Sequence, residues 1–387
     1  MISSIGEGLR NQFYSDQPLV SVVIPAFNAS AYIESTLRSA LRQTYTALEI
    51  IVVNDGSTDD TAKLVRRIAS TDPRIRLLST LNRGVAAARN TGIEASLGRY
   101  VAFLDADDLW HRTKIEKQVN ALDRLSSRWA AVYTLHCFIN EDDEIIHGGS
   151  ADCARGYIYA RHLSFKYVGN GSALLVRRNV ALEIGGFDSS YAAAGIGGCE
   201  DLDFELKLAA RYFIEVVPER LVGYRKHPGS MSSNHLRMAK SALEVVRRSI
   251  AANPRLPRYA IRSAIDATQK YAFWELRRAR KTYLSLVTIW PTLLSDPNYA
   301  ARLVLQKCLR GANRCLRLRM TTRCEELPRR NRPKFDDQII PSFIENPMGN
   351  PQLRRLLRLT AVDFKLSSIV RSKRRDLLRT TAELQSD

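Results

Sequence analysis

The chain has 387 residues, of which 45% are hydrophobic and 25% charged, as expected for a globular protein of two or three domains. Its formal net charge of +18 is unusual and is unevenly distributed. Residues 1–234 carry 26 Lys and Arg against 27 Asp and Glu, whereas residues 235–387 carry 32 against 13. The first part is therefore close to neutral and the second strongly basic, which favours separate roles for the two parts.

The cysteines and the apolar segments indicate the cellular compartment of the protein. The six cysteines form no C-x-x-C pair and no regular framework, so reduced, mostly buried thiols in a cytoplasmic protein are expected. The first residues lack the charged-then-apolar order of a signal peptide. The longest apolar run of the basic part, Tyr283–Leu294, contains a proline and is shorter than the ~20 residues that span a bilayer. Any membrane association is therefore expected to be peripheral, at the inner face.

Buried strands alternate with helices along the first hundred residues. Short apolar runs predict strands at Leu19–Ala26, Leu48–Val53, Ile75–Leu78 and Val101–Leu104. Cap residues and apolar spacing predict helices over Tyr32–Gln43, near Asp60–Ala69 and from Asn82–Asn90 onward. This order is typical of a doubly wound α/β domain with a parallel sheet, which binds ligands at the carboxyl ends of its strands.

Acidic residues follow two of these strands. Asp105, Asp107 and Asp108 come directly after the fourth strand, and carboxylates two residues apart on an extended backbone can hold a hard cation such as Mg²⁺ or Mn²⁺ beside a phosphate. The alternative is an acidic turn that caps the next helix. Asp55 ends the second strand in a glycine turn, where a carboxylate among backbone N–H groups would stay ionised and accept hydrogen bonds, or would simply cap a helix.

These motifs together resemble a known family. The series SVVIPAFN, VVNDGSTDDT and NRGVAAARNTGIEASLGRYVAFLDADD, in this order and spacing, resembles the nucleotide-sugar-binding half of the inverting family-two glycosyltransferases with a GT-A fold. The resemblance covers about residues 19–235. It implies a Rossmann-like, mostly parallel sheet flanked by helices over 19–235, after a leader segment at 1–18 and before a basic, mainly helical extension at 236–387.

The resemblance also implies a donor site with a divalent metal. In the family, the acid after the second strand binds the base and ribose, the Asp-x-Asp pair holds the metal that bridges the diphosphate, and a histidine in the closing segment reaches the diphosphate or its metal. Guanidinium groups match phosphate geometry, so Arg83 and Arg89 are candidates for the diphosphate or the base, or are solvated helix charges. The donor-binding residues implied here are Pro25, Asn28, Asp55, Arg83, Asp105, Ala106, Asp107 and His227, and the metal ligands are Asp105, Asp107 and His227.

A second acidic pair begins a helix further along the chain. Leu202 and Leu206 have helical spacing, which places Glu200 and Asp201 in the first turn, where the helix dipole favours acids whatever their function. The pair also resembles the Glu-Asp motif of the family, which implies that Asp201 is the catalytic base and Glu200 supports it or binds the acceptor. Such a base would serve a single displacement that inverts the anomeric carbon. Weaker acceptor-side candidates are Asn170, Gly171 and Ser172.

The basic part of the chain is expected to be mainly helical. The third of its predicted helices alternates Leu and Cys with Arg and Lys, a pattern suited to an anionic lipid surface or to a core-packing helix with a solvated basic face. Residues Glu325–Pro351, with five prolines, are expected to form a linker or loose loop. The predicted helices are His235–Ala252, Pro257–Lys281, Ala300–Met320, Leu353–Leu359 and Phe364–Leu378.

Two functions remain after these observations. The first is a metal-dependent glycosyltransferase that moves a sugar from a nucleotide-diphosphate sugar to a hydroxyl of a glycan or lipid-linked acceptor in surface polysaccharide or glycoconjugate synthesis. The resemblance favours UDP, with GDP and dTDP open. The second is an inactive transferase-like protein that binds nucleic acid or anionic membrane through the basic part. That part lacks interleaved aromatic residues and zinc-ligand spacing, which argues against nucleic acid.

Overall fold

The computed structural model describes residues 17–296, 299, 301, 303, 334, 335, 340, 341, 355–368 and 370. Most of three predicted segments lies outside these residues: the leader at 1–18, the helix at Ala300–Met320 and the linker at Glu325–Pro351. Of the cysteines within them, Cys137 and Cys199 are buried and Cys153 is exposed, and all three are free thiols.

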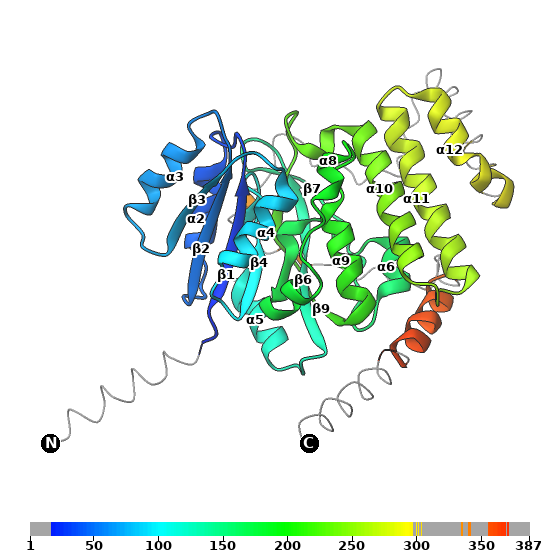
Figure 1. The fold of residues 1–387 in the computed structure, drawn as a ribbon, viewed down its shortest axis with the longest axis horizontal. Helices are drawn as coiled ribbons and strands as arrows, with labels where there is room; N and C mark the ends of the chain where they lie inside the picture. The colour runs from blue at the N-terminus through cyan, green and yellow to red at the C-terminus, as the bar shows by residue number, and fades with distance from the viewer. Residues whose placement is uncertain are drawn as a thin grey trace.

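The first half of the fold is a parallel α/β unit (Figure 1). Its strands pair in the order β3-β2-β1-β4, and β1 pairs in parallel with both β2 and β4. Each predicted strand and helix is present, with ends that differ by a few residues. The strands are β1 (Val20–Ala26), β2 (Leu48–Asp55), β3 (Ile75–Thr80) and β4 (Tyr100–Phe103), and the helices are α2 (Ile33–Leu41), α3 (Thr61–Ala69) and α4 (Val85–Ala95).

Apolar runs and small residues explain this unit. Every residue of β1, β2 and β4 is buried, as expected for central strands of a parallel sheet covered on both faces. Helix α4 lies close to β1 because it carries small side chains at the contact. A Cβ added at Gly92 would lie only 2.2 Å from Val23 Cγ1. The close approach of α4 fixes the position of its N-terminus relative to the ends of the strands.

The second half extends the sheet with mixed strand directions. The full order is β10-β9-β6-β8-β4-β1-β2-β3, with β5 paired to β9 and β7 to β6. Strand β8 is antiparallel to β4 and β6, whereas β9 is parallel to β6. The expected α/β sheet with flanking helices and a helical C-terminal region is therefore confirmed. The strands added are β5 (Leu109–Trp110), β6 (Trp129–Ile139), β7 (Ile145–Gly148), β8 (Leu174–Arg177), β9 (Phe213–Arg225) and β10 (Ile340–Pro341).

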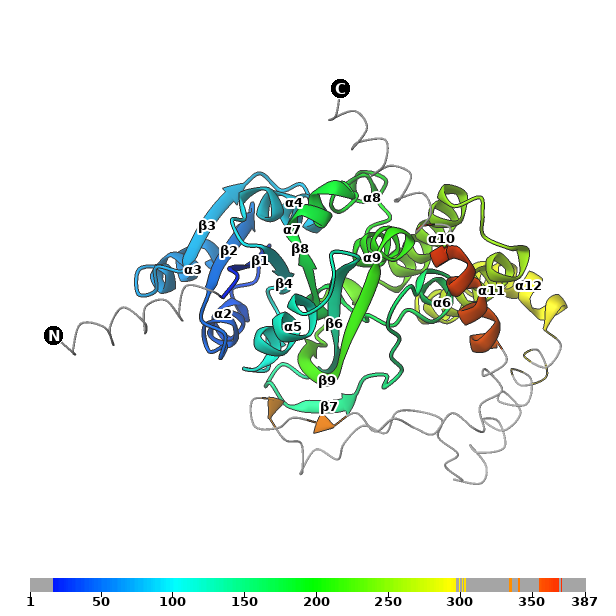
Figure 2. The same ribbon diagram turned by 90° about the horizontal axis from the view of Figure 1, so that it is seen from below.

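The remaining helices lie mostly at the end of the molecule opposite α3 and β3, as Figures 1 and 2 both show. No helix in the described part of the chain combines the length and hydropathy needed to cross a membrane. These helices are α5 (Lys114–Asp123), α6 (Tyr159–Phe165), α7 (Arg178–Glu183), α8 (Ser190–Ala193), α9 (Glu200–Arg211), α10 (His235–Ala252), α11 (Arg258–Arg278) and α12 (Thr282–Ser295).

The helices of the basic part share the core of the α/β unit. Val245 on α10 and Ala264 on α11 belong to the same hydrophobic cluster as Val22 and Phe103. The change in charge near residue 235 therefore does not coincide with a change of core. Helix α10 has the predicted bounds, and α11 ends three residues earlier than expected.

For the basic part, one expectation is confirmed and one prediction is wrong. The apolar run at Tyr283–Leu294, expected to be too short to span a bilayer, lies in helix α12, and no described helix could cross a membrane. The two helices predicted at Leu353–Leu359 and Phe364–Leu378 are joined, because residues 355–368 are continuously helical. Asp363 lies in the expected gap, but its buried carboxylate accepts the backbone N–H of Ala160 at 2.6 Å and pairs with Arg161 at 2.7 Å, which holds this helix against α6.

Candidate active site

A cavity of about 930 Å³ lies at the carboxyl ends of β1, β2 and β4. We call it the large cavity. Its walls are the loops that follow these strands, the N-terminal end of α4 and the segment after β9. All eight residues predicted to bind a donor line it: Pro25, Asn28, Asp55, Arg83, Asp105, Ala106, Asp107 and His227.

Asp55 is held at the end of β2 by the start of α4. Its Oδ1 accepts the backbone N–H of Arg83 at 2.9 Å, and its Oδ2 accepts that of Gly84 at 2.8 Å. Gly84, the N-cap residue of α4, has a φ of +88°, which a glycine adopts without strain. The carboxylate is therefore oriented by two backbone donors while it borders the large cavity. These bonds are not the helix capping considered as the alternative for Asp55, because both donors precede the first turn of α4, whose N-cap residue makes no side-chain cap bond.

Asn28 lines the large cavity at the end of the neighbouring strand β1. It has a φ of +48°, and its side-chain oxygen accepts the backbone N–H of Thr58 at 2.8 Å. Its own backbone N–H donates to Ser57 Oγ at 3.0 Å. Asn28 does not cap α2, whose N-cap residue is Tyr32, without a side-chain cap bond. The Asn28 side chain instead ties the loop after β1 to the loop after β2.

The Asp-x-Asp pair follows β4, which pairs with β1 on the side away from β2. Asp105 Oδ1 accepts a bond from Arg89 Nη2 at 2.5 Å, and Asp107 Oδ2 lies 2.9 Å from His227 Nε2. Both side chains keep about a quarter of their surface exposed, 27% and 28%. The structure therefore brings Asp105, Asp107 and His227 to one edge of the large cavity, although they come from segments 120 residues apart.

The donor chemistry of this edge fits a hard cation in part. Two carboxylates face the cavity, and Arg89 and His227 each contact one oxygen of them. Among the described residues, however, no three His, Cys, Asp or Glu side chains are grouped to hold a metal by themselves. Mg²⁺ is usually bound by one or two carboxylates together with substrate phosphates and water. The pair suits a cation that arrives with a diphosphate better than a permanent structural ion.

Asp108, the third acid of this stretch, is a core residue. It is fully buried and accepts bonds from Ser172 Oγ at 2.6 Å, Asn170 Nδ2 at 2.8 Å and the Arg225 backbone at 3.0 Å. Burial, and then the charges of Asp107 and Asp105, raise the pKa of this carboxyl well above its ordinary value. Asn170 and Ser172, considered for the acceptor side, both hold Asp108, and Asn170 also lines the second cavity described below.

Arg89 is not a solvated helix charge, and it lines the second cavity described below, while a role at the diphosphate or base stays a prediction. Its side chain is 5% exposed, and it does not line the large cavity. Its guanidinium pairs with Asp105 and lies over the Phe187 ring, 5.0 Å from the centroid. Its buried Nε has no hydrogen-bond partner. Arg89 thus backs the Asp-x-Asp motif from the protein interior.

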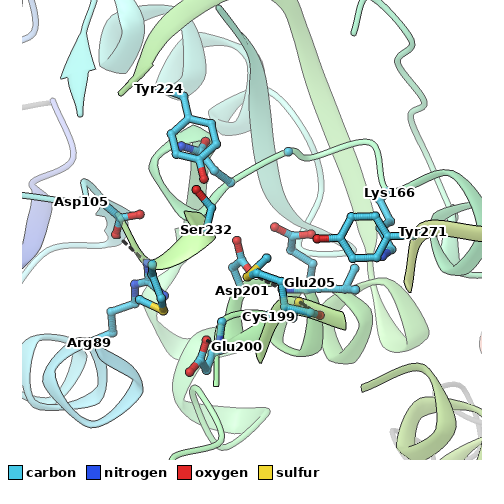
Figure 3. Close-up of a pocket in the computed structure, with 16 residues that line it drawn as sticks. Arg89, Asp105, Lys166, Cys199, Glu200, Asp201, Glu205, Tyr224, Ser232 and Tyr271 are labelled. Atoms are coloured by element: carbon cyan, nitrogen blue, oxygen red, sulfur yellow. Dashed lines mark hydrogen bonds and ion pairs between the residues drawn. The ribbon is translucent and has the colours of Figure 1, made fainter. Parts of the chain in front are cut away.

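A second cavity of about 230 Å³, the small cavity, opens at the N-terminus of α9 (Figure 3). Asp201 lines it, and Figure 3 shows Asp201 between the Arg89–Asp105 pair on one side and Lys166 and Tyr271 on the other. Both cavities are bordered by the same five residues, so they meet. The shared residues are Asp105, Glu200, Tyr224, Met231 and Ser232.

The two predicted catalytic acids lie where the cavities meet. Glu200 is buried, borders both cavities and accepts the backbone N–H of Gly198 at 2.7 Å. Burial, and after it the charge of Glu205, raise the pKa of the Asp201 carboxyl to about 7, against the opposing charge of Arg89. A carboxylate that titrates close to neutral pH has the acidity that general base catalysis favours.

Several residues of the small cavity were not identified from the sequence. Burial raises the pKa of Glu205 to about 8, and its Oε2 lies 2.9 Å from Nε2 of the buried His162. Because His162 Nδ1 accepts the Tyr167 backbone N–H at 3.1 Å, its Nε2 carries the proton and donates it toward Glu205. Glu205 is four residues after Asp201 on α9, so helical spacing was a signal for it. Lys166 and Tyr271 carried no such signal, because they come from α6 and α11.

Comparisons with known proteins agree with this geometry. Residues 21–164 match the model of the family Glycosyl transferase family 2. An uncharacterized glycosyltransferase of Haemophilus influenzae is 42% identical over 106 residues, which are 27% of this chain and 42% of that protein. TuaG of Bacillus subtilis, a glycosyltransferase assigned to teichuronic acid biosynthesis, is 40% identical over 136 residues, 34% of this chain and 53% of TuaG. The chain thus spans about half or less of the length of these relatives.

Solved structures show the same fold at low identity. Mannosyltransferase PcManGT from Pyrobaculum calidifontis, in complex with GDP-Man and Mn²⁺, aligns over 78% of this chain and 88% of its own with a TM-score of 0.53 and 21% identity. S. aureus TarS in complex with UDP-GlcNAc aligns over 67% and 73%, with a TM-score of 0.51 and 16% identity. The segment with residues 21–164 is therefore a family 2 glycosyltransferase domain of the GT-A type.

Proposed function

We propose that this chain is an inverting glycosyltransferase that transfers a hexosyl group from a UDP-sugar to a hydroxyl of a glycan or lipid-linked acceptor. The observation that carries the proposal is the junction of the two cavities at Asp105 and Glu200. A donor in the large cavity with its diphosphate at the Asp-x-Asp motif would present its sugar toward the small cavity, next to Asp201.

The large cavity supplies groups for each part of a nucleotide sugar. Asp55 would accept bonds from the ribose or the base, since backbone donors orient its carboxylate. Arg83 lines the cavity and would bind a phosphate. The fold-related structures hold UDP, UDP-GlcNAc or GDP-Man, which supports a nucleotide-sugar donor. UDP is preferred from the sequence resemblance.

Asp105 and Asp107 would hold a Mn²⁺ or Mg²⁺ ion together with the diphosphate, with His227 as the third predicted ligand. Such an ion would supply charge neutralisation of the leaving diphosphate. Asp105 is kept in place by Arg89, and Asp107 by His227. The protein thus orients both carboxylates before a donor binds.

The proposed step uses Asp201 as the base. Asp201 would remove the proton from the acceptor hydroxyl while that oxygen forms a bond to the anomeric carbon and the bond from that carbon to the diphosphate oxygen breaks. The nucleoside diphosphate leaves from the opposite face, so the anomeric configuration is inverted. Glu200 would support the base or bind a second acceptor hydroxyl from its place between the cavities.

The acceptor is proposed to be a surface polysaccharide, a glycoconjugate or its lipid-linked precursor. Relatives include TuaG of teichuronic acid biosynthesis and the chondroitin synthase of Escherichia coli, 38% identical over 132 residues. The basic part of this chain would keep the enzyme at the inner face of a membrane, close to such an acceptor.

Calorimetric titration of UDP, GDP and dTDP, each with and without Mn²⁺, tests the donor assignment. We expect UDP to bind with Mn²⁺, and we expect the double variant Asp105→Asn/Asp107→Asn to lose the metal-dependent part. Asp142→Asn/Asp152→Asn, two acids outside both cavities, is the matched control. Preference for GDP or dTDP would change the donor class, and a well-folded wild type that binds no nucleotide would contradict the transferase proposal.

A further inference from the structure

Helix α12 has its large apolar side chains on the outside. Tyr283 is 78% exposed, Trp290 60% and Leu294 68%. A surface helix of a globular protein normally turns such residues toward the core. Figures 1 and 2 both place α12 at the outer edge of the molecule. The full exposed apolar set, which we call the α12 face, is Tyr283, Leu284, Leu286, Val287, Trp290 and Leu294.

The inner side of α12 is small and partly polar. Its buried residues are Ser285, Ile289 and Thr292, which follow one another at helical spacing. Thr292 Oγ1 donates to Gln269 Oε1 on α11 at 2.7 Å. The helix is therefore attached to α11 in a fixed orientation by polar contacts, with its hydrophobic side turned away from the protein.

Basic side chains lie next to one end of the α12 face. Helix α12 itself contains no charged residue, but the segment before it carries four exposed basic side chains within five residues. Arg278 pairs with Glu275 at 2.5 Å, and Arg277 donates to Thr282 Oγ1 at 3.4 Å. The other two, Arg280 and Lys281, have no carboxylate within ion-pair distance among the described residues.

We propose that the α12 face, together with Arg280 and Lys281, is a docking surface for an anionic phospholipid bilayer. Aromatic side chains such as Tyr283 and Trp290 are favoured at the boundary of headgroups and acyl chains, and exposed cations beside them are attracted to anionic headgroups. A second copy of the chain fits less well, because a two-fold contact through α12 would bring two basic segments of a +18 protein together.

The docking surface is connected to the small cavity through α11. Tyr271 of α11 lines that cavity, and its chain neighbour Lys270 pairs with Asp296, just after α12, at 3.0 Å. Gln269, which holds Thr292, lies two residues before Tyr271. A bilayer bound at α12 would thus lie on the side of the molecule whose helices complete the small cavity. This position suits an acceptor carried by a lipid, although the docking proposal does not depend on the reaction.

Vesicle co-sedimentation tests the proposal with the full-length protein. We expect binding to vesicles of phosphatidylcholine containing about 30% phosphatidylglycerol, and weaker binding to phosphatidylcholine alone or at about 0.5 M NaCl. Leu286→Glu/Trp290→Glu should lower the affinity about tenfold or more, and Arg280→Gln/Lys281→Gln should lower it by a similar factor. The control Leu97→Glu/Leu182→Glu changes two exposed apolar residues elsewhere and should bind like wild type.

A second readout locates the contact. Phosphatidylcholine with brominated acyl chains, mixed with phosphatidylglycerol, should quench tryptophan emission of the wild type, and Trp290→Phe should lose most of this quenching while it still binds. Thermal unfolding and nucleotide binding like those of wild type would show that each variant is folded. The proposal is overturned if wild type does not bind the anionic vesicles, if Leu286→Glu/Trp290→Glu binds them equally well, or if the face proves to mediate self-association without vesicle binding.

Discussion

The two cavities differ in how the chain builds them. The large cavity is formed mainly by loops that follow β1, β2 and β4, all within the first 110 residues, and completed by the segment after β9. The small cavity takes Lys166 from the end of α6, Asp201 and Glu205 from α9, and Tyr271 from α11. The first is a product of local strand-to-helix turns, and the second of long-range packing. Changes to the large cavity should therefore alter nucleotide binding, and changes to the small cavity should alter turnover.

The largest expected effect is that of Asp201→Asn. Loss of the general base should slow sugar transfer by about 10²–10⁴-fold and leave the affinity for UDP unchanged. Steady-state kinetics together with calorimetry check both parts. Asp203→Asn is the control on the same helix, because Asp203 faces away from both cavities and accepts a bond from Tyr191 Oη at 3.1 Å. An Asp201→Asn variant with near wild-type turnover would mean that another group is the base.

Arg89→Met should have the next largest effect, because it removes the buried cation that pairs with Asp105. Breaking a buried ion pair costs about 3–5 kcal/mol of unfolding free energy, and we expect a value near the lower end because Asp105 is 27% exposed. Urea unfolding measures the change. Arg83→Met, at a side chain with no ion-pair partner among the described residues, should cost less than about 0.5 kcal/mol. Equal losses for both variants would contradict the structural role of Arg89.

Glu205→Gln should change the pH profile without removing the base. With the pKa of Asp201 raised to about 7, kcat/KM in wild type should fall as the pH drops through about 7, because the base becomes protonated. Glu205 is the second cause of that shift, so its neutral replacement should move this acidic limb to lower pH. Glu215→Gln, a buried carboxylate outside both cavities, should leave the limb in place. If the acidic limb of the profile stays in place or moves to higher pH in Glu205→Gln, then Glu205 does not raise the pKa of the base.

The smallest expected effect is that of Tyr271→Ala. Tyr271 lines only the small cavity, with Lys166 Nζ 4.3 Å from its ring centroid. We expect kcat/KM for the acceptor to fall about tenfold, equivalent to ~1.4 kcal/mol, while UDP affinity stays within about twofold of wild type. Weaker UDP binding in this variant would show that the two cavities are not separable in function.

The same contrast explains what the sequence could predict. Buried apolar runs end in polar turns at Asp55 and Asp105, and parallel strands bring such ends to one edge, so the position of the large cavity could be predicted. Ser189 and Ala192 at α8 and Arg237 on α10 also line it and were not identified. Glu205 was accessible from helical spacing but was not recognised. Lys166 and Tyr271 depend on how α6 packs against α9 and α11 against α6, a long-range arrangement that no local pattern records. The roles of the predicted site residues remain predictions until they are tested.

Helix α12 was not predicted from the sequence, for a different reason. Its apolar residues were weighed only as a membrane span, and Pro291 argued against one. A helix held by Ser285 and Thr292 with its apolar side outward has no ordinary amphipathic pattern. The charge boundary near residue 235 was equally uninformative about packing, because Val245 and Ala264 enter the core of the α/β unit.

Release of UDP from a panel of UDP-sugars, with water or an added glycan as acceptor, tests the central claim most directly. Wild type with Mn²⁺ should release UDP from at least one sugar donor. Asp201→Asn should release it at least about 100-fold more slowly although it binds UDP as well as wild type does. If wild type binds UDP but releases none from any UDP-sugar, or if Asp201→Asn matches wild type, then the meeting point of the two cavities is not the site of sugar transfer.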